Sequence, residues 1–196
     1  FSYVHLCDVT HYLNHYYLVS LLGLLLAALP TGDFASVDAW RARRHGAPAR
    51  PRVVAAWMVW LVRFQIGVVY FFGGVGKLNG DWLFHAEPLV TWLARSTDVP
   101  VLGAFAGDSR LAFAMSWAGA AFDLSAPFLL WARRTRPFAY IAACAFHLIT
   151  ARLFQLGMFP WLMMAFALIF FAPTWPIDLA RRIGLAVPEA ASGAAS

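Results

Sequence analysis

Five long apolar runs, separated by polar or proline-containing segments, dominate the sequence. They cover about residues 12–29, 53–75, 111–131, 138–156 and 159–171. The length of the second run is close to the ~20 residues that an α-helix needs to cross a hydrocarbon core about 30 Å thick. The pattern therefore predicts an all-α protein, a polytopic transmembrane bundle of about five spans in which the fifth is short.

A polar segment of residues 79–109 separates the second and third runs. It is too long for a tight connector, and its stretch 83–94 can form an interfacial helix. After Arg182 the chain consists largely of small residues, so we expect a membrane domain over residues 1–180 and a disordered tail over residues 181–196.

The composition supports a membrane protein and excludes a nucleic-acid partner. Of the 196 residues, 61% are hydrophobic and only 13% are charged. A soluble domain of this length does not need so much apolar surface, whereas a bundle solvated by lipid does. The net charge of +5 comes from arginines in short loops between the runs, where they bear on topology.

The loop charges predict an orientation. Arginines concentrate in the first loop, the third loop and the tail: Arg41, Arg43, Arg44, Arg50, Arg52, Arg133, Arg134, Arg136, Arg181 and Arg182. With five spans these three segments share one side, and the positive-inside rule makes that side cytoplasmic. The second loop and the N-terminus then share the opposite side.

Ionisable residues inside the runs are candidates for function, because each costs at least ~2.5–3.5 kcal/mol at the centre of a span. They are His11, His15, Arg63, Lys77, Asp123, His147 and Arg152. Arg63 and Asp123 have comparable predicted depths, which indicates a structural ion pair. His11 and His15 are four residues apart, but no third ligand with helical spacing accompanies them, so we predict no metal site.

Lys77 is the only lysine among 15 lysines and arginines. Where a cation only has to pair or reach the interface, this chain uses arginine, so a lone lysine indicates a position that requires a deprotonatable amine. The preceding Gly73, Gly74 and Gly76 remove side-chain bulk and allow a flat ligand or another backbone to approach. The alternative is a lysine that merely extends to the membrane interface.

Taken together, four strings resemble the vitamin K-dependent gamma-glutamyl carboxylase family and its bacterial relatives with an HTTM membrane domain. They are YLNHYYL at 12–18, QIGVVYFFGGVGKLNGDW at 65–82, FDLSAP at 122–127, and FH at 146–147 followed by LFQLGMFPW at 153–161. They occur in family order. Since a further span precedes the Asn-His string in that family, we expect the chain to be truncated at its N-terminus.

The resemblance implies a lyase whose cofactor is reduced vitamin K, with oxygen and carbon dioxide as co-substrates. The family's base, which deprotonates the hydroquinone, corresponds to Lys77, and the other active-centre positions correspond to His15 and His147. Tyr70 and the three glycines are the expected cofactor contacts. Oxidation of the hydroquinone then drives proton removal from the γ-carbon of glutamate, and the carbanion captures carbon dioxide.

The resemblance also implies partners and a location. We expect a multi-pass protein of a bacterial inner membrane, with Lys77 toward the periplasm, whose partners are the bilayer, a lipidic quinone and a glutamate-containing protein or peptide. Thr150 stands where the animal enzymes have Asn. The alternative function is a quinone-binding or quinone-oxidising protein of the same bundle that does not carboxylate, and a structural or transport bundle ranks last.

Overall fold

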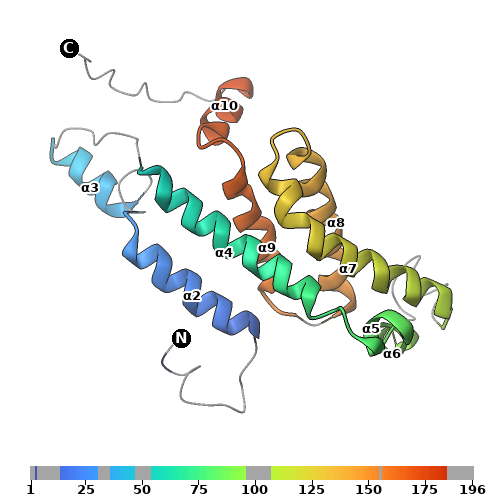
Figure 1. The fold of residues 1–196 in the computed structure, drawn as a ribbon. Coiled ribbons are helices and arrows are strands. Elements are labelled where there is room, and N and C mark those ends of the chain that lie inside the picture. The colour runs from blue at the N-terminus through green and yellow to red at the C-terminus, as the bar shows by residue number, and fades with distance from the viewer. Residues whose placement is uncertain are drawn as a thin grey trace. The chain divides into compact units, whose positions relative to one another are not determined.

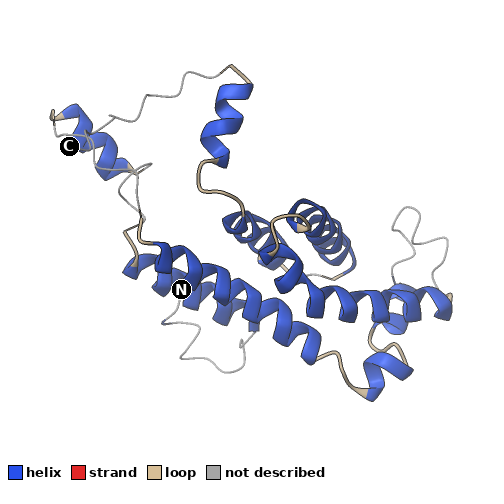
Figure 2. Cartoon of the chain, turned by 45° about the horizontal axis from the view of Figure 1, so that its top comes forward, coloured by secondary structure: helices blue, strands red, loops and turns tan. Residues whose placement is uncertain are grey.

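The computed structural model describes residues 3, 14–30, 36–46, 54–95, 107–154 and 156–184. Within these residues the regular secondary structure is helical, and no strand is present (Figure 2). The chain forms two compact units. One comprises residues 1–62 and 172–196, and the other comprises residues 63–171.

Each predicted apolar run coincides with a helix (Figure 1). The helices are α2 (Asn14–Ala28), α4 (Ala56–Val75), α7 (Ser109–Trp131), α8 (Arg136–Leu153), and α9 (Phe159–Ala167) with its 3-10 extension η3 (Leu168–Phe170). Only α4, with 20 residues, and α7, with 23, are long and apolar enough to cross a membrane among the helices described. These two helices support the prediction of a membrane protein, but they do not establish five spans.

Two short helices that the sequence pattern did not predict lie in the first unit. They are α3 (Val37–Arg44) and α10 (Trp175–Arg182). Each has an aspartate in its first turn, where a negative charge is stabilised by the helix dipole. The prediction of a disordered tail from residue 181 was wrong at its start, because Arg181 and Arg182 complete α10. Residues 185–196 of that tail lie outside the described residues.

The segment between α4 and α7 contains two short helices, α5 (Gly80–Phe84) and α6 (Leu89–Arg95). The prediction of one interfacial helix over residues 83–94 was therefore wrong. Pro88 explains the interruption, because it has no N–H to donate and disfavours the helical conformation at the residue before it. Both short helices pack against α7.

Small side chains allow the helices of the second unit to approach closely. The buried residues of α8 recur every four positions, at Ala139, Ala143 and His147, so they form one stripe. A Cβ atom added at Gly74 would lie 2.7 Å from Cγ and 2.8 Å from the backbone N of Leu124. The contact between α4 and α7 therefore requires glycine at this position.

Arg63 does not pair with Asp123, so that prediction was wrong. Its Nε donates to the carbonyl oxygen of Ile169 at 2.8 Å, and Nη2 donates to that of Phe171 at 3.2 Å. These carbonyls lie at the end of η3, where backbone acceptors lack partners within the helix. The guanidinium therefore caps a helix end and is not the counter-ion of Asp123.

Candidate functional site

A cavity of about 660 Å³ lies within the second unit, lined by residues of α4, α5, α6, α7, α8 and α9. Its lining is mainly apolar and includes Trp92, Phe122, Phe146, Phe154 and Phe159. Phe122 and Phe146 contact one another with ring centroids 4.7 Å apart. A concave apolar site with a few polar groups is the usual form of a small-molecule site.

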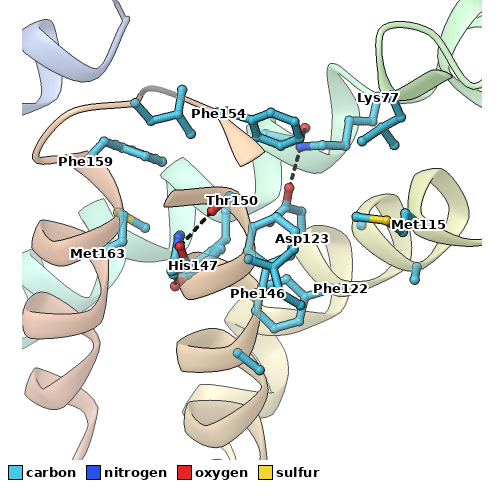
Figure 3. Close-up of a pocket in the computed structure, with 18 of the residues that line it drawn as sticks. Lys77, Met115, Phe122, Asp123, Phe146, His147, Thr150, Phe154, Phe159 and Met163 are labelled. Carbon is cyan, nitrogen blue, oxygen red and sulfur yellow. Dashed lines mark hydrogen bonds and ion pairs between the residues drawn. The ribbon is translucent and has the colours of Figure 1, made fainter. Parts of the chain in front are cut away.

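Lys77 and Asp123 form the first polar pair of the cavity lining, and Figure 3 shows their side chains pointing at one another. Lys77 Nζ lies 2.5 Å from Oδ2 of Asp123 and also donates to the carbonyl oxygen of Gly73 at 3.1 Å. The exposed fractions of the two side chains are 19% for Lys77 and 7% for Asp123. The pair is therefore largely withdrawn from solvent.

The helical repeat of α4 explains how Lys77 reaches the cavity. Tyr70, Gly73 and Lys77 stand at positions i, i+3 and i+7, which share one face of a helix. Lys77 follows the end of α4, and its backbone N–H donates to the carbonyl oxygen of Gly74 at 2.9 Å, so the turn continues. A Cβ at Gly73 would lie 3.6 Å from Oδ2 of Asp123, so glycine leaves the carboxylate room beside the helix.

Trp82 on α5 contributes a second contact to Lys77. Nζ lies 5.1 Å from the centroid of the indole ring, a distance at which an ammonium is attracted to the ring face. Two hydrogen bonds fix Trp82 against α7. Its Nε1 donates to the carbonyl oxygen of Ser116 at 2.9 Å, and the Ser116 hydroxyl donates to the carbonyl oxygen of Trp82 at 2.5 Å.

Tyr70 and His147 form the second polar pair. The Tyr70 hydroxyl lies 2.8 Å from Nε2 of His147, and each residue is only 2% exposed. Nδ1 of His147 has no hydrogen-bond partner within the described residues. A buried polar atom left without a partner costs about 1–3 kcal/mol, so this atom indicates a site for a ligand group.

The structure brings together most of the residues predicted for the site. Lys77, His147, Tyr70, Gly73 and Gly76 line the cavity. Gly74 does not line it and instead meets Leu124. His15 lies at the start of α2 in the other unit, partly buried, with its ring 4.8 Å from that of Tyr16. The described residues contain no group of three His, Cys, Asp or Glu side chains that could hold a metal ion.

From the sequence, Asp123 was expected to pair with Arg63 rather than with Lys77, and no role was predicted for Ser116 or Trp82. A signal was available for two of them, because Ser116 and Asp123 are seven positions apart and therefore lie on the same face of α7. Trp82 ends the string of residues 65–82 that carries the family resemblance, but its contact with Lys77 depends on how α5 packs against α7.

These features define a helical membrane protein with an aromatic-walled cavity into which a lysine-aspartate pair and a buried histidine project. The chain belongs to the HTTM-domain family, whose family model matches residues 1–175. This domain is found in proteins related to the vitamin K-dependent carboxylases. No solved structure matches the chain at a significant level.

Proposed function

We propose that this protein is a gamma-glutamyl carboxylase-like membrane enzyme that binds vitamin K hydroquinone in the cavity and uses Lys77 to take a proton from it. The observation that carries the proposal is the placement of the chain's only lysine on an aromatic-walled cavity. Family membership supports it, because this domain is found in proteins related to these carboxylases.

The lining fits a reduced quinone in chemistry. A flat aromatic ring system matches walls built from Phe122, Phe146 and Phe154, and the ring hydroxyls need polar partners inside an apolar site. Lys77 Nζ and the free Nδ1 of His147 supply such partners. When bound, the reduced quinone supplies the oxygen-dependent oxidation that generates a strong base for removing the γ-proton of glutamate.

The protein's own groups then have distinct tasks. Lys77 receives the hydroxyl proton, since a positioned side chain that accepts a proton contributes about 10²–10⁴-fold to a rate. His147 binds the ligand through Nδ1, while Tyr70 fixes its ring through the bond to Nε2. The aromatic walls exclude water, which strengthens every electrostatic interaction in the site.

One observation favours the non-carboxylating alternative. Among the described residues that line the cavity, Lys77 is the only lysine or arginine, and it is already paired with Asp123. A glutamate substrate brings a carboxylate that needs a cation of its own. Oxidation of the quinone without carboxylation is therefore the second candidate function.

The test is to incubate the protein in lipid vesicles with vitamin K hydroquinone, oxygen and labelled bicarbonate, with a glutamate-containing peptide present. Quinone epoxide and peptide-bound label are measured separately. If both products form, the carboxylase is supported. If only the epoxide forms, the quinone oxidase is supported. If no product forms, the proposal is overturned.

Lys77 variants test the residue assignment in the same assay. We expect Lys77→Ala and Lys77→Arg to lose at least about 10²-fold in epoxide formation, because neither side chain releases and regains a proton readily. Arg110→Ala is the matched control, since it removes an exposed cation from the first turn of α7. Full activity in Lys77→Arg would show that only a positive charge is needed.

A further inference from the structure

The pairing of Lys77 with Asp123 leads to an inference that rests on the proposed function and refines it. We infer that Asp123 is the final acceptor of the substrate's proton and that Lys77 acts as the relay between the two. The deprotonatable amine expected from the sequence is held in an ion pair.

In the resting site, Lys77 and Asp123 form an ion pair. Oδ2 of Asp123 lies 2.5 Å from Lys77 Nζ, and the carboxylate is 93% shielded, with 7% of its side chain exposed. A buried carboxylate is strongly unfavourable unless it is paired. The cation that pairs with Asp123 is Lys77. Arg63, the other candidate, is instead bonded to carbonyl oxygens at the end of η3. An amine that serves as counter-ion to a carboxylate carries its proton and cannot be a free base.

A two-proton relay resolves this conflict and keeps the charges balanced. Lys77 Nζ gives one proton to Oδ2 of Asp123 and takes the proton of the substrate hydroxyl in its place. One O–H bond of the substrate breaks, one N–H bond is replaced at Nζ, and one O–H bond forms on Asp123. The negative charge moves from the carboxylate to the substrate oxygen, so the total charge of the site is unchanged.

The relay accounts for lysine at this position. After the transfer Lys77 is still an ammonium, and it now faces the negative substrate oxygen inside a cavity of low polarity, where the attraction is strong. Arginine would pair equally well with Asp123, but a guanidinium does not release its proton. Lysine alone combines the pairing with the transfer.

The surroundings keep the two groups in register. Nζ is held from three sides by the carbonyl oxygen of Gly73, the carboxylate and the Trp82 ring. Trp82 is in turn bonded to Ser116, which lies on the same helix as Asp123.

A direct test uses the fact that the chain has one lysine. Protein labelled with ¹⁵N-lysine in detergent micelles gives a single side-chain signal, whose chemical shift distinguishes ammonium from amine. We expect ammonium both before and after the anaerobic addition of vitamin K hydroquinone, which prevents turnover. A neutral amine in the resting protein would overturn the relay.

Infrared difference spectroscopy follows the other end of the relay in the same anaerobic sample. We expect hydroquinone to produce the carbonyl band of one protonated carboxyl group, and we expect this band to be missing in Asp123→Asn. Asp178→Asn, which removes an exposed aspartate of α10, should keep it. Absence of the band in the unaltered protein would contradict the proposal.

Activity and binding then separate this inference from the proposed function. Asp123→Asn should bind hydroquinone within about threefold of the unaltered protein and lose about 10²–10⁴-fold in epoxide formation, and Asp123→Glu should recover part of the loss. If the unaltered protein makes no epoxide, the proposed function fails and the relay with it. If Lys77→Ala is inactive but Asp123→Asn keeps its rate, only the relay fails.

Asp123→Glu provides a second test of the relay in case Asp123→Asn does not fold. If that variant does not bind hydroquinone, Asp123→Glu decides, because it keeps a carboxyl group one methylene further from the backbone. Turnover together with the protonated carboxyl band in Asp123→Glu supports the relay. If Asp123→Glu binds hydroquinone without showing that band, the relay is overturned.

Discussion

At the scale of single residues, the site depends on two adjacent glycines that do different things. Gly73 faces the carboxylate of Asp123, and Gly74 faces the backbone of Leu124. The sequence indicated that the glycines admit either a flat ligand or another backbone, without assigning either role to one glycine. The structure shows that one leaves space for a polar pair, while the other allows two helices to touch.

Replacing each glycine by alanine should separate these roles. In Gly74→Ala the new Cβ would lie 2.8 Å from the Leu124 backbone N, so α4 and α7 must move apart at a cost of about 1–3 kcal/mol. In Gly73→Ala the Cβ makes an ordinary contact at 3.6 Å, and stability should change by less than about 1 kcal/mol. Thermal unfolding in detergent measures both. Equal midpoints would contradict the close contact at Gly74.

Tyr70→Phe tests the buried tyrosine-histidine pair. Removing the hydroxyl leaves Nε2 of His147 without the partner it has at 2.8 Å, so the folded state should lose about 1–3 kcal/mol. Hydroquinone binding should weaken as well, because the imidazole is no longer oriented. Tyr17→Phe is the control, since Tyr17 is 48% exposed on α2. Matching unfolding midpoints for the two variants would rule out a structural role for the bond.

At the scale of elements, two arginines cap the carbonyl ends of helices. Arg63 bonds to the end of η3, and Arg136 donates to the carbonyl oxygens of Leu130 and Trp131 at the end of α7. A cation at the end of a helix stabilises the orphan acceptors and opposes the negative end of the helix dipole. From the sequence, Arg136 was interpreted as a topology signal and Arg63 as an ion-pair partner. In the structure, both side chains cap the C-terminal ends of helices.

Arg63→Met should destabilise the second unit by about 1–3 kcal/mol, because it removes charge-assisted bonds to carbonyl oxygens that have no other partner in the helix. Arg63→Lys should recover only part of the loss, since an ammonium lacks the forked geometry of guanidinium. The measurement is the unfolding midpoint in detergent, with Arg110→Met as a control at an exposed site. A midpoint unchanged by Arg63→Met would contradict the capping role.

At the scale of the whole molecule, α4 and α7 are the two helices that meet the length and hydropathy of a membrane span. If α4 crosses the bilayer, residues before Ala56 and after Val75 lie on opposite sides. The arginine-rich loop before α4 then lies in the cytoplasm under the positive-inside rule. Under the same condition, Lys77, which follows α4, lies at the opposite surface, and the quinone of the proposed function would reach the cavity there.

Cysteine labelling tests this topology. In a background carrying Cys7→Ala and Cys144→Ala, single cysteines are introduced by Gly80→Cys, Arg44→Cys and Thr135→Cys. We expect a membrane-impermeant maleimide to label Gly80→Cys from the outside, and to label the other two only in inverted vesicles. Labelling of Gly80→Cys and Arg44→Cys from the same side would show that α4 is not a span.

The sequence by itself determined the helical class and the position of the main helices. An apolar run is a local property, and burying its backbone polar groups in lipid requires a helix. The singular Lys77 was also visible, because a residue type used once among many arginines stands out without any structure. The interruption at Pro88 could have been predicted too, since the cause is local.

Only the tertiary structure decided which cation meets Asp123. Arg63 and Lys77 are 14 positions apart, about 20 Å along a helix, so just one of them can lie at the depth of Asp123. The choice depends on how α4 and α7 are placed against one another. The close contact between Gly74 and Leu124 sets that placement. Gly74 lies three residues before Lys77, and Leu124 directly follows Asp123. Hydrophobic periodicity identifies each helix alone but carries no information on such an offset between two helices.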